Sequence, residues 1–319
     1  MPRVVALAGG VGGAKLAHGL AAILAPGELT VIVNTGDDAE FHGLLVCPDH
    51  DTVLYTLAGL ADRERGWGLA EETWAAAAML ERLGEPAWFR LGDRDLALHV
   101  HRTRHLREGV RLTEVNRGIQ RALGVATPIL PMADEPVRTR VRTPEGWLAF
   151  QDYFVRLHQV PDVLEVAFAG IEEARPTPEV AAAFAGAEAI VLCPSNPFVS
   201  IGPILAVPGM RALIDEARAR GARVAAVSPL VGGRALKGPA DRMARSLGAE
   251  SSATGIARLY AGLIDALLVD GVDAVEAPAI AALGIEPIMG PAVMTDDASR
   301  AALAAAAVAA VAAASRRAC

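Results

Sequence analysis

The chain has 319 residues, of which 52% are hydrophobic and 21% are charged, so it can build a sizeable core, and wholesale disorder is excluded. Its net charge of −7 arises from 30 basic and 37 acidic residues without any basic tract, which argues against nucleic acid as the main partner. An acidic protein that binds anions must therefore supply positive charge locally, from backbone amides, a few basic side chains or a metal ion.

The three cysteines, Cys47, Cys193 and Cys319, have neither the spacing of a zinc site nor that of a disulfide framework. A reducing cytoplasm is therefore the expected compartment. The N-terminus enters a strand at once, without a basic and apolar leader. The longest apolar run, 301–314, is shorter than the roughly 20 residues that a membrane span needs, and it predicts a terminal surface helix.

A glycine-rich turn follows the first predicted strand, 4–8, and leads into an amphipathic helix. Glycine allows backbone N–H groups to approach a phosphate closely, and the start of a helix adds partial positive charge. The turn matches neither the Gly-x-Gly-x-x-Gly pattern of a Rossmann fingerprint nor a P-loop, and a turn with only a packing role is the alternative. A phosphorylated ligand is predicted to bind at Gly9, Gly10, Gly12, Gly13 and Lys15.

Strand-like apolar runs recur along the chain with helical segments between them. This alternation predicts an α/β fold of Rossmann-like type, with a mostly parallel sheet and helices on both faces. The clearest runs after the first strand are 29–33, 163–168, 189–193, 223–227 and 267–269.

The stretch 52–125 contains helical patterns, including 71–83 and 96–107, but no convincing strand. We expect it to form an inserted helical cap within a single α/β domain that spans 1–319. Further along the chain, polar–apolar alternation around a Pro-Glu-Gly turn predicts a β-hairpin within 137–154.

Acidic residues gather after the second predicted strand. Asn34, Asp37 and Asp38 lie at its end, and Asp49 and Asp51 come just before a predicted helix. In open α/β sheets ligands bind beyond the carboxyl ends of strands, so these carboxylates should face the same crevice as the glycine-rich turn. Mg²⁺ takes one or two carboxylates and bridges diphosphate oxygens, which makes the cluster a candidate magnesium site. The alternative gives Asp51 the N-cap of the helix and Asp38 a place in a turn.

Other polar segments could contribute to the same site. An anion could rest on Arg94 with Asp95 or Asp93 orienting it, although Asp93 could equally cap the helix that it opens and pair with Arg94. Ser195 and Asn196 follow a strand of buried type and offer short donors to a nucleotide phosphate or base, with a helix cap as the alternative for Ser195. Ser228 follows the next strand and could line the same edge.

His99, His101 and His105 include an i, i+4 pair, but no Glu-x-x-His context or third ligand accompanies them. A solvated or cap-packing role is therefore expected for all three. The sequence contains neither a Gly-x-Ser-x-Gly elbow nor a Cys/His pair that would predict acyl chemistry.

The motifs together, and their order, point to a known family. The chain resembles the 2-phospho-L-lactate transferases of coenzyme F-420 biosynthesis, the CofD family, whose bacterial members are phosphoenolpyruvate transferases. The likeness extends from the first strand to 294–296, and the combination of motifs is far more specific than each motif alone. It rests on the segments 9–15, 34–38, 47–56, 92–97, 150–156 and 193–205.

This resemblance implies a transferase with Mg²⁺ as its cofactor. Such an enzyme moves a phosphorylated three-carbon acid, phosphoenolpyruvyl or 2-phospholactyl, from a GDP-linked donor to the ribityl hydroxyl of the deazaflavin Fo and releases GMP. A metal held by Asp37 and Asp51 would polarise the diphosphate, and one nearby carboxylate could accept the hydroxyl proton. Ser195 and Asn196 would belong to the guanosine half. No residue identifies which acid the donor carries.

Aromatic side chains could cover the flat deazaflavin ring, since stacking suits it. The candidates are Trp88, Phe150 and Phe154, although Trp88 and Phe154 could equally be core residues. The segment 150–156 carries Tyr-Phe where a Trp-rich version is expected in some bacterial relatives, which leaves the contacts to the acceptor ring open.

Two other classes of protein compete with this interpretation. Regulators of the same fold bind nucleotide-sugars without transferase chemistry, but in such a regulator the segments 92–97 and 150–156 would have no role. An NAD-dependent oxidoreductase requires an acidic residue at the end of the second strand, where Asn34 stands. A homodimer is the expected assembly, because closed twofold assemblies are the commonest kind.

Overall fold

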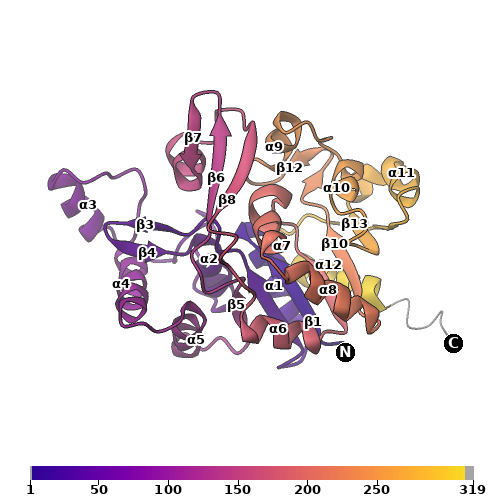
Figure 1. Ribbon diagram of the computed structural model, residues 1–319, viewed down its shortest axis with the longest axis horizontal. Helices are drawn as coiled ribbons and strands as arrows, with labels where there is room; N and C mark the ends of the chain where they lie inside the picture. Colours follow the sequence, from indigo (N-terminus) through magenta and orange to yellow (C-terminus); the bar gives the residue numbers. More distant parts are fainter. Residues whose placement is uncertain (1, 313–319) are drawn as a thin grey trace.

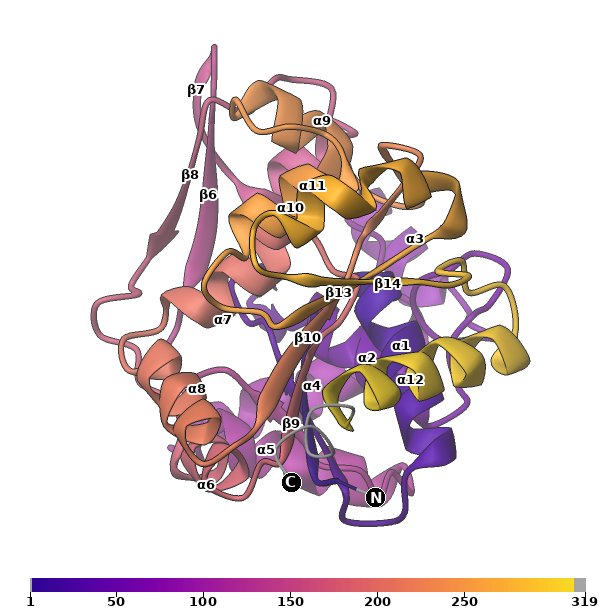
Figure 2. The same ribbon diagram turned by 90° about the vertical axis from the view of Figure 1, so that its right-hand side faces the viewer.

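The computed structural model describes residues 2–312 and has a parallel sheet at its centre (Figure 1 and Figure 2). Seven strands pair in parallel in the order β14-β13-β10-β9-β1-β2-β5, which confirms the predicted α/β fold with a mostly parallel sheet. They are β1 (Val4–Ala8), β2 (Leu29–Val33), β5 (Ile129–Pro131), β9 (Ala189–Leu192), β10 (Arg223–Val227), β13 (Ala266–Val269) and β14 (Glu286–Met289).

The central strands are buried on both faces, which explains why they read as continuous apolar runs. In β1, Val5 and Leu7 join one core, whereas Val4, Ala6 and Ala8 join the other. The second core packs under α1 (Gly10–Ile23), α2 (Pro48–Leu57), α5 (Leu112–Ala122) and α12 (Asp297–Ala312). The first packs under α6 (Pro178–Ala185), α7 (Gly202–Ala206), α8 (Met210–Ala219), α10 (Ala253–Leu259) and α11 (Ala277–Ala281).

The last helix, α12, covers the sheet rather than lying on the surface alone. Leu303 and Ala304 are buried in the core beside α1 (Figure 2). A Cβ on Gly19 of α1 would lie 2.2 Å from the carbonyl oxygen of Arg300, so the two helices touch. The expectation of a surface helix is wrong here, because small alanine side chains permit this close approach. The predicted helical run ends at residue 314, and its last two residues, 313–314, lie outside the described residues.

The segment 52–125 has the helical character that its sequence predicts. It contains most of α2, then α3 (Ala75–Arg82), α4 (Asp93–Arg107) and α5, and α3 and α4 project beside the sheet in Figure 1. One isolated bridge joins Ala61 to Leu69. The role of this segment as a cap within one domain stays a prediction.

Three small antiparallel sheets accompany the parallel one, and the smallest pairs β11 (Leu230–Val231) with β12 (Arg234–Ala235). β3 (Ala39–Phe41) pairs with β4 (Leu44–Val46), and β6 (Arg138–Thr143) pairs with both β7 (Gly146–Ala149) and β8 (Glu165–Ala169). The predicted hairpin is confirmed as β6–β7. The strand expected at 163–168 is β8, which joins β6 and not the parallel sheet. Sequence analysis did not predict β3, β4, β5 and β14, because runs of three or four residues show little periodicity.

Short elements connect these layers. They are the strands β11 (Leu230–Val231) and β12 (Arg234–Ala235), the helix α9 (Ala240–Ser246), and single turns at Asp152–Arg156, Pro197–Ile201 and Gly271–Glu276. Within 2–312, no single helix is long and apolar enough to cross a membrane. One bent pair of helical segments, Pro197–Ala206 with Met210–Ala219, has the length and composition of a membrane span, and these two criteria alone support it.

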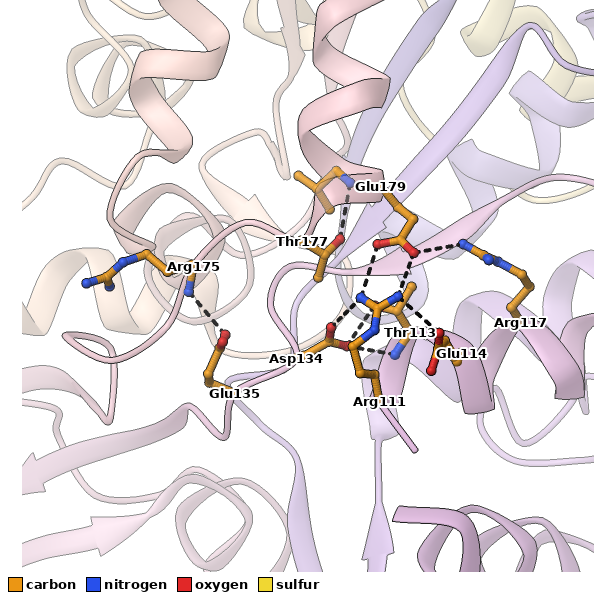
Figure 3. A network of polar contacts seen from close by, with 10 residues as sticks. Arg111, Thr113, Glu114, Arg117, Asp134, Glu135, Arg175, Thr177 and Glu179 are labelled. Atoms are coloured by element: carbon orange, nitrogen blue, oxygen red, sulfur yellow. Dashed lines mark hydrogen bonds and ion pairs between the residues drawn. The ribbon is translucent and has the colours of Figure 1, made fainter. Parts of the chain in front are cut away.

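A polar network ties α5 to the opposite core layer (Figure 3). Arg111, at the start of α5, donates to Asp134 at 2.9 Å and to Glu179 of α6 at 2.8 Å. Asp134 also accepts the Thr113 N–H at 2.8 Å, which satisfies a free amide of the first turn of α5. These contacts hold the end of the helical segment against the sheet.

Candidate functional site

The strand order reverses between β1 and β9. From β1 the chain adds β2 and β5 on one side of the sheet, and later it adds β9, β10, β13 and β14 on the other. Ligands of open α/β sheets bind at such a switch point, beyond the carboxyl ends of the strands. A cavity of about 640 Å³ lies there, lined by the glycine-rich turn and by residues that follow β2, β9 and β10.

The glycine-rich turn packs too closely for side chains. A Cβ on Gly9 would lie 2.4 Å from Asp49 Oδ2 and 2.7 Å from Ser200 Cβ. Gly10 has a φ of +62°, which favours glycine. The Gly10 N–H donates to Asp49 Oδ1 at 2.6 Å, and the Gly9 N–H donates to Ser195 Oγ at 3.0 Å. The sequence predicts that backbone N–H groups of this turn bind a phosphate, but side chains of the site already accept the N–H groups of Gly9 and Gly10.

Gly12 and Lys15 also line the cavity, whereas Gly13 does not. A Cβ on Gly13 would lie 2.6 Å from Ser195 Oγ, so this glycine allows the turn to pack against the segment after β9. Lys15, one turn into α1, donates from Nζ to the carbonyl oxygen of Met294 at 2.8 Å. Its ammonium therefore lies at the cavity with a neutral partner.

Asp37 and Asp49 lie together beyond the end of β2. Asn34 Nδ2 donates to Asp37 Oδ1 at 3.1 Å and to Asp49 Oδ2 at 2.9 Å, from behind the cavity wall. Burial and repulsion from Asp49 raise the pKa of Asp37, and burial raises the pKa of Asp49 to about 6. Within the described chain neither carboxylate pairs with a lysine or arginine, so the two together could accept a cation.

Asp51 faces the same cavity from α2 but has a cationic partner. Arg102 of α4 is fully buried and donates from Nη1 to Asp51 Oδ2 at 2.9 Å and from Nη2 to Oδ1. Burial alone would raise the pKa of Asp51, but the Arg102 guanidinium holds it well below its usual range. Asn116 fixes Arg102 by accepting its Nε–H at 3.1 Å. The alternative in which Asp51 caps α2 is wrong, because the helix begins at Pro48 and places Asp51 inside its first turn.

A buried group of two aspartates and one histidine could hold a metal ion. One ligand atom each from Asp51, Asp95 and His99 lies within 4.8 Å of the others. His99 Nε2 is 3.2 Å from Asp95 Oδ1, and the Tyr55 hydroxyl donates to the same oxygen. Of the solvated or cap-packing role expected for His99, the structure excludes the solvated one, because the inward face of α4 buries this side chain completely.

The chain is similar to known transferases along nearly its whole length. The family model described as "2-phospho-L-lactate transferase CofD" matches residues 4–311. The chain belongs to the CofD family. The family expected from the motifs is thereby confirmed: the protein is an enzyme, a phosphoenolpyruvate or 2-phospho-L-lactate transferase of coenzyme F-420 biosynthesis.

Individual relatives show how far the likeness extends. The chain is 44% identical to a phosphoenolpyruvate transferase of Kitasatospora aureofaciens, over 95% of each chain. It is 37% identical to a 2-phospho-L-lactate transferase of Methanosarcina barkeri, over 92% of this chain and 93% of that one. A solved structure from Bacillus halodurans, of the UPF0052 family, shares the fold alone, with a TM-score of 0.64 at 17% identity over 96% of this chain and 98% of that chain.

In this CofD-family protein an aromatic wall bounds the cavity. Phe150 and Phe154 stack with ring centroids 5.3 Å apart. Gln151, between them in sequence, donates from Nε2 to the backbone oxygen of Asp37 at 2.9 Å, which joins this wall to the carboxylates. The aromatic residues that line the cavity are Tyr55, Trp67, Trp88, Phe89, Phe150 and Phe154, so all three aromatic candidates named from the sequence reach it.

The polar residues after β9 and β10 also line the cavity of this CofD-family chain. Ser195 Oγ donates to the Gly9 carbonyl oxygen at 2.7 Å, and Ser228 Oγ donates to the Leu230 carbonyl oxygen at 2.9 Å. Asn196 Oδ1 accepts the N–H of Phe198 at 2.9 Å. The helix cap considered for Ser195 therefore belongs to Asn196, and both residues remain positioned to meet a ligand.

Besides Gly13 and Asn34, three further residues of the predicted site do not line the cavity. Asp38 is buried beneath it, and burial raises its pKa to about 7. Asp93 opens α4, but its carboxylate accepts the N–H of Ala76 at 2.9 Å and so caps α3 instead of its own helix. Arg94 is exposed and donates to the Ala70 carbonyl oxygen at 2.8 Å, so Asp93 and Arg94 do not form the ion pair considered from the sequence.

Sequence analysis assigned no role to several residues that complete the site. Arg102 carried one usable signal, because it lies three residues after His99 and therefore on the same face of α4. The others, apart from Tyr55 of α2, come from loops without a recognisable motif. The unassigned residues at or beside the cavity are Tyr55, Arg65, Trp67, Phe89, Arg90, Arg102 and Lys237.

Proposed function

We propose that this protein moves a phosphoenolpyruvyl or 2-phospholactyl group, together with its phosphate, from a GDP-linked donor to the ribityl hydroxyl of Fo and releases GMP. The observation that carries this proposal is a single cavity that combines buried carboxylates, a glycine-rich turn and an aromatic wall in a member of the CofD family. Relatives named for each of the two acids align over most of this chain, so the proposal includes both.

Three parts of the cavity suit three parts of the reactants. The glycine-rich turn would hold phosphate oxygens of the donor. Ser195, Asn196 and Ser228, which follow β9 and β10, would contact the guanosine half. Trp88 and Phe154 would cover the deazaflavin ring, because flat aromatic rings stack favourably. The donor would thus lie across the sheet edge with its diphosphate near β1.

The carboxylates fit a divalent cation, which we propose is Mg²⁺. Asp37 and Asp49 are buried side by side without a cationic partner among residues 2–312, and a bound ion would relieve their repulsion. Asp37 and Asp51 would hold the ion, Asp51 through the oxygen lone pairs that its hydrogen bonds to Arg102 leave free, and the bound ion would polarise the diphosphate. Oxygen ligands suit Mg²⁺, whereas the imidazole of His99 suits transition metals, so His99 is not part of the proposed set.

The chain's own groups would orient the acceptor and take its proton. The hydroxyl oxygen forms a bond to the phosphorus that carries the three-carbon acid, the bond from that phosphorus to the GMP oxygen breaks, and the electron pair leaves with GMP. A carboxylate at the cavity would accept the hydroxyl proton. Asp37 suits this step better than Asp51, because the Arg102 guanidinium holds the pKa of Asp51 well below its usual range and so makes it a weak base.

Turnover of defined substrates tests this function. The purified chain is incubated with Fo, a GDP-linked donor and Mg²⁺, and mass spectrometry is expected to detect GMP and a charged deazaflavin product. Absence of both products would favour a nucleotide-binding regulator of the same fold. Parallel rates with phosphoenolpyruvyl, 2-phospholactyl and 3-phosphoglyceryl donors identify the acid that the enzyme transfers.

A further inference from the structure

Two lysines at the cavity stand apart from the carboxylate cluster. Lys15 lies on α1, and Lys237 follows the β11–β12 hairpin. Both line the cavity. Lys15 donates only to the neutral carbonyl of Met294, and within residues 2–312 neither ammonium has a carboxylate partner. Uncompensated positive charge at a cavity of an acidic protein is the arrangement expected for an anion site.

The two lysines act on each other, although they are more than 200 residues apart in sequence. Burial, together with repulsion from Arg300 and Lys237, lowers the pKa of Lys15. A Cβ on Gly66 would lie 2.1 Å from Lys237 Nζ, so the loop of the helical segment closes over this ammonium where no side chain obstructs it. An anion between the lysines would relieve their repulsion.

Another cavity-lining cation is already compensated. Arg65 lies 2.8 Å from Asp62 Oδ2 and donates to the Leu69 carbonyl oxygen at 2.8 Å. Its guanidinium also lies 4.8 Å from the centre of the Trp67 ring. These contacts satisfy Arg65 within the protein, whereas the charges of Lys15 and Lys237 remain available to a ligand.

Lys237 and Asp37 reach one edge of the sheet from opposite sides of β1, and Lys15 lies on α1, which follows β1 itself. Lys237 follows β10, and Asp37 follows β2, and these strands lie on opposite sides of β1. A diphosphate above the turn that follows β1 would therefore present one phosphate to the carboxylate side and the other to the lysine side. Ser228, proposed to contact guanosine, also follows β10, so the phosphate on this side is the one attached to the nucleoside.

We propose that Lys15 and Lys237 bind the phosphate that leaves with the nucleoside. This inference rests on the proposed function. When the hydroxyl oxygen bonds to the transferred phosphorus and the bond to the GMP oxygen breaks, the electron pair stays on the GMP phosphate. Two ammonium groups beside that phosphate would stabilise the negative charge that develops there. The lysines would thus favour both binding of the nucleotide and departure of GMP.

Nucleotide binding by Lys237 variants tests this inference. Calorimetry with the full chain compares GMP and guanosine, which differ only by the phosphate. Lys237→Met is expected to raise the Kd for GMP about tenfold, as for a lost hydrogen bond between charged groups, and to leave guanosine binding unchanged. Lys237→Arg should retain most of the GMP affinity. The Kd of Lys237→Met for GMP should also respond less to added NaCl than that of the wild type.

Arg234→Met is the matched control, because it removes one positive charge from the same hairpin at a residue that does not line the cavity. It should leave both affinities unchanged. Equal GMP affinities of Lys237→Met and the wild type, or equal losses for GMP and guanosine, would overturn the lysine assignment. Turnover measured in parallel separates the two proposals: a wild-type chain that binds GMP but never releases it from a donor would contradict the proposed function instead.

Discussion

At the scale of single residues, the cavity aspartates Asp37, Asp49 and Asp51 have different electrostatic surroundings. Arg102 pairs with Asp51 and keeps it ionised, whereas Asp37 and Asp49 share the amide of Asn34 and have raised pKa values. The charge of Asp51 is therefore compensated by a cation of the protein, whereas the charges of Asp37 and Asp49 are not. A cation would bind where the charge is uncompensated, which is why Asp37 is central to the metal prediction.

Removal of a metal-binding carboxylate should abolish the reaction, although Asp51→Asn also leaves the buried Arg102 guanidinium without its counter-charge and so lowers stability. Asp37→Asn and Asp51→Asn are each expected to lose Mg²⁺-dependent turnover, because the amide is a weaker ligand and carries no charge. GMP release measures turnover, and circular dichroism checks the fold. Asp38→Asn, a change beneath the cavity, serves as the control. Normal turnover by both variants would show that the metal assignment is wrong.

Arg102 should stabilise the fold through Asp51. Arg102→Met leaves Asp51 buried without a counter-charge, so the free energy of unfolding should fall by about 3–5 kcal/mol at pH 7, as measured in urea. Adding Asp51→Asn should recover part of the loss. Arg104→Met, which breaks an exposed ion pair with Glu108 on the same helix, should cost less than about 1 kcal/mol. Similar losses from both arginines would contradict the buried pair.

The raised pKa of Asp49 predicts a pH dependence of the metal-free protein. Folding raises this pKa from 3.8 to about 6, so between these values the folded state binds more protons than the unfolded state. The free energy of unfolding should therefore fall by roughly 2–3 kcal/mol as pH rises from about 4 to 7. Urea unfolding in EDTA measures this fall. The fall should be smaller in Asp49→Asn, and an identical profile would refute the assignment.

At the scale of elements, the turn between β1 and α1 determines where the site can form. Gly9 brings the backbone close to Asp49 and Ser200, and Ser195 bonds to the backbone of Gly9 from the neighbouring strand end. The turn is therefore a packing unit as well as a ligand site. Its glycines are required by neighbouring protein atoms before any ligand is considered.

A methyl group at this turn should disturb both stability and activity. Gly9→Ala places a Cβ 2.4 Å from Asp49 Oδ2, so we expect a loss of about 1–3 kcal/mol of stability and a large loss of turnover. Gly118→Ala in α5 is the control, because no atom lies within 4 Å of that Cβ and alanine favours a helix by about 0.5–1 kcal/mol. Thermal unfolding and GMP release compare the two variants, and equal behaviour would contradict the packing argument.

At the scale of the whole molecule, the site joins elements from the entire chain. The helical segment supplies Trp88 and Arg102, the small antiparallel sheet leads to Phe150, and the parallel sheet supplies the carboxylates and the glycine-rich turn. Such a site cannot form in any one part of the sequence. Folding of all layers is therefore a requirement for the reaction.

The expected assembly is a homodimer. Closed twofold assemblies are the commonest kind among soluble oligomers, so sedimentation equilibrium should give a mass of twice 33.2 kDa. A dilution series below micromolar protein would show whether the dimer persists. A mass of 33.2 kDa at all concentrations would contradict the expectation.

The sequence by itself determined the elements whose signal is local. The predicted strands at 29–33 and 223–227 coincide with β2 and β10, because four of the five residues in each strand are buried and apolar and read as one run. The glycine-rich turn and the aspartates were equally visible, since strand ends that share one sheet edge lie together whatever the rest of the chain does. The family followed from these motifs and their order.

Only the tertiary structure decided the partners of these residues. Arg102 lies 51 residues from Asp51, and Ser195 lies 186 residues from Gly9. The periodicity of α4 indicates which face is buried but not which distant carboxylate that face meets, and Asp93 accordingly caps a neighbouring helix instead of its own. Whether a cavity charge is compensated depends on long-range packing, because Coulomb interactions act through space and not along the chain.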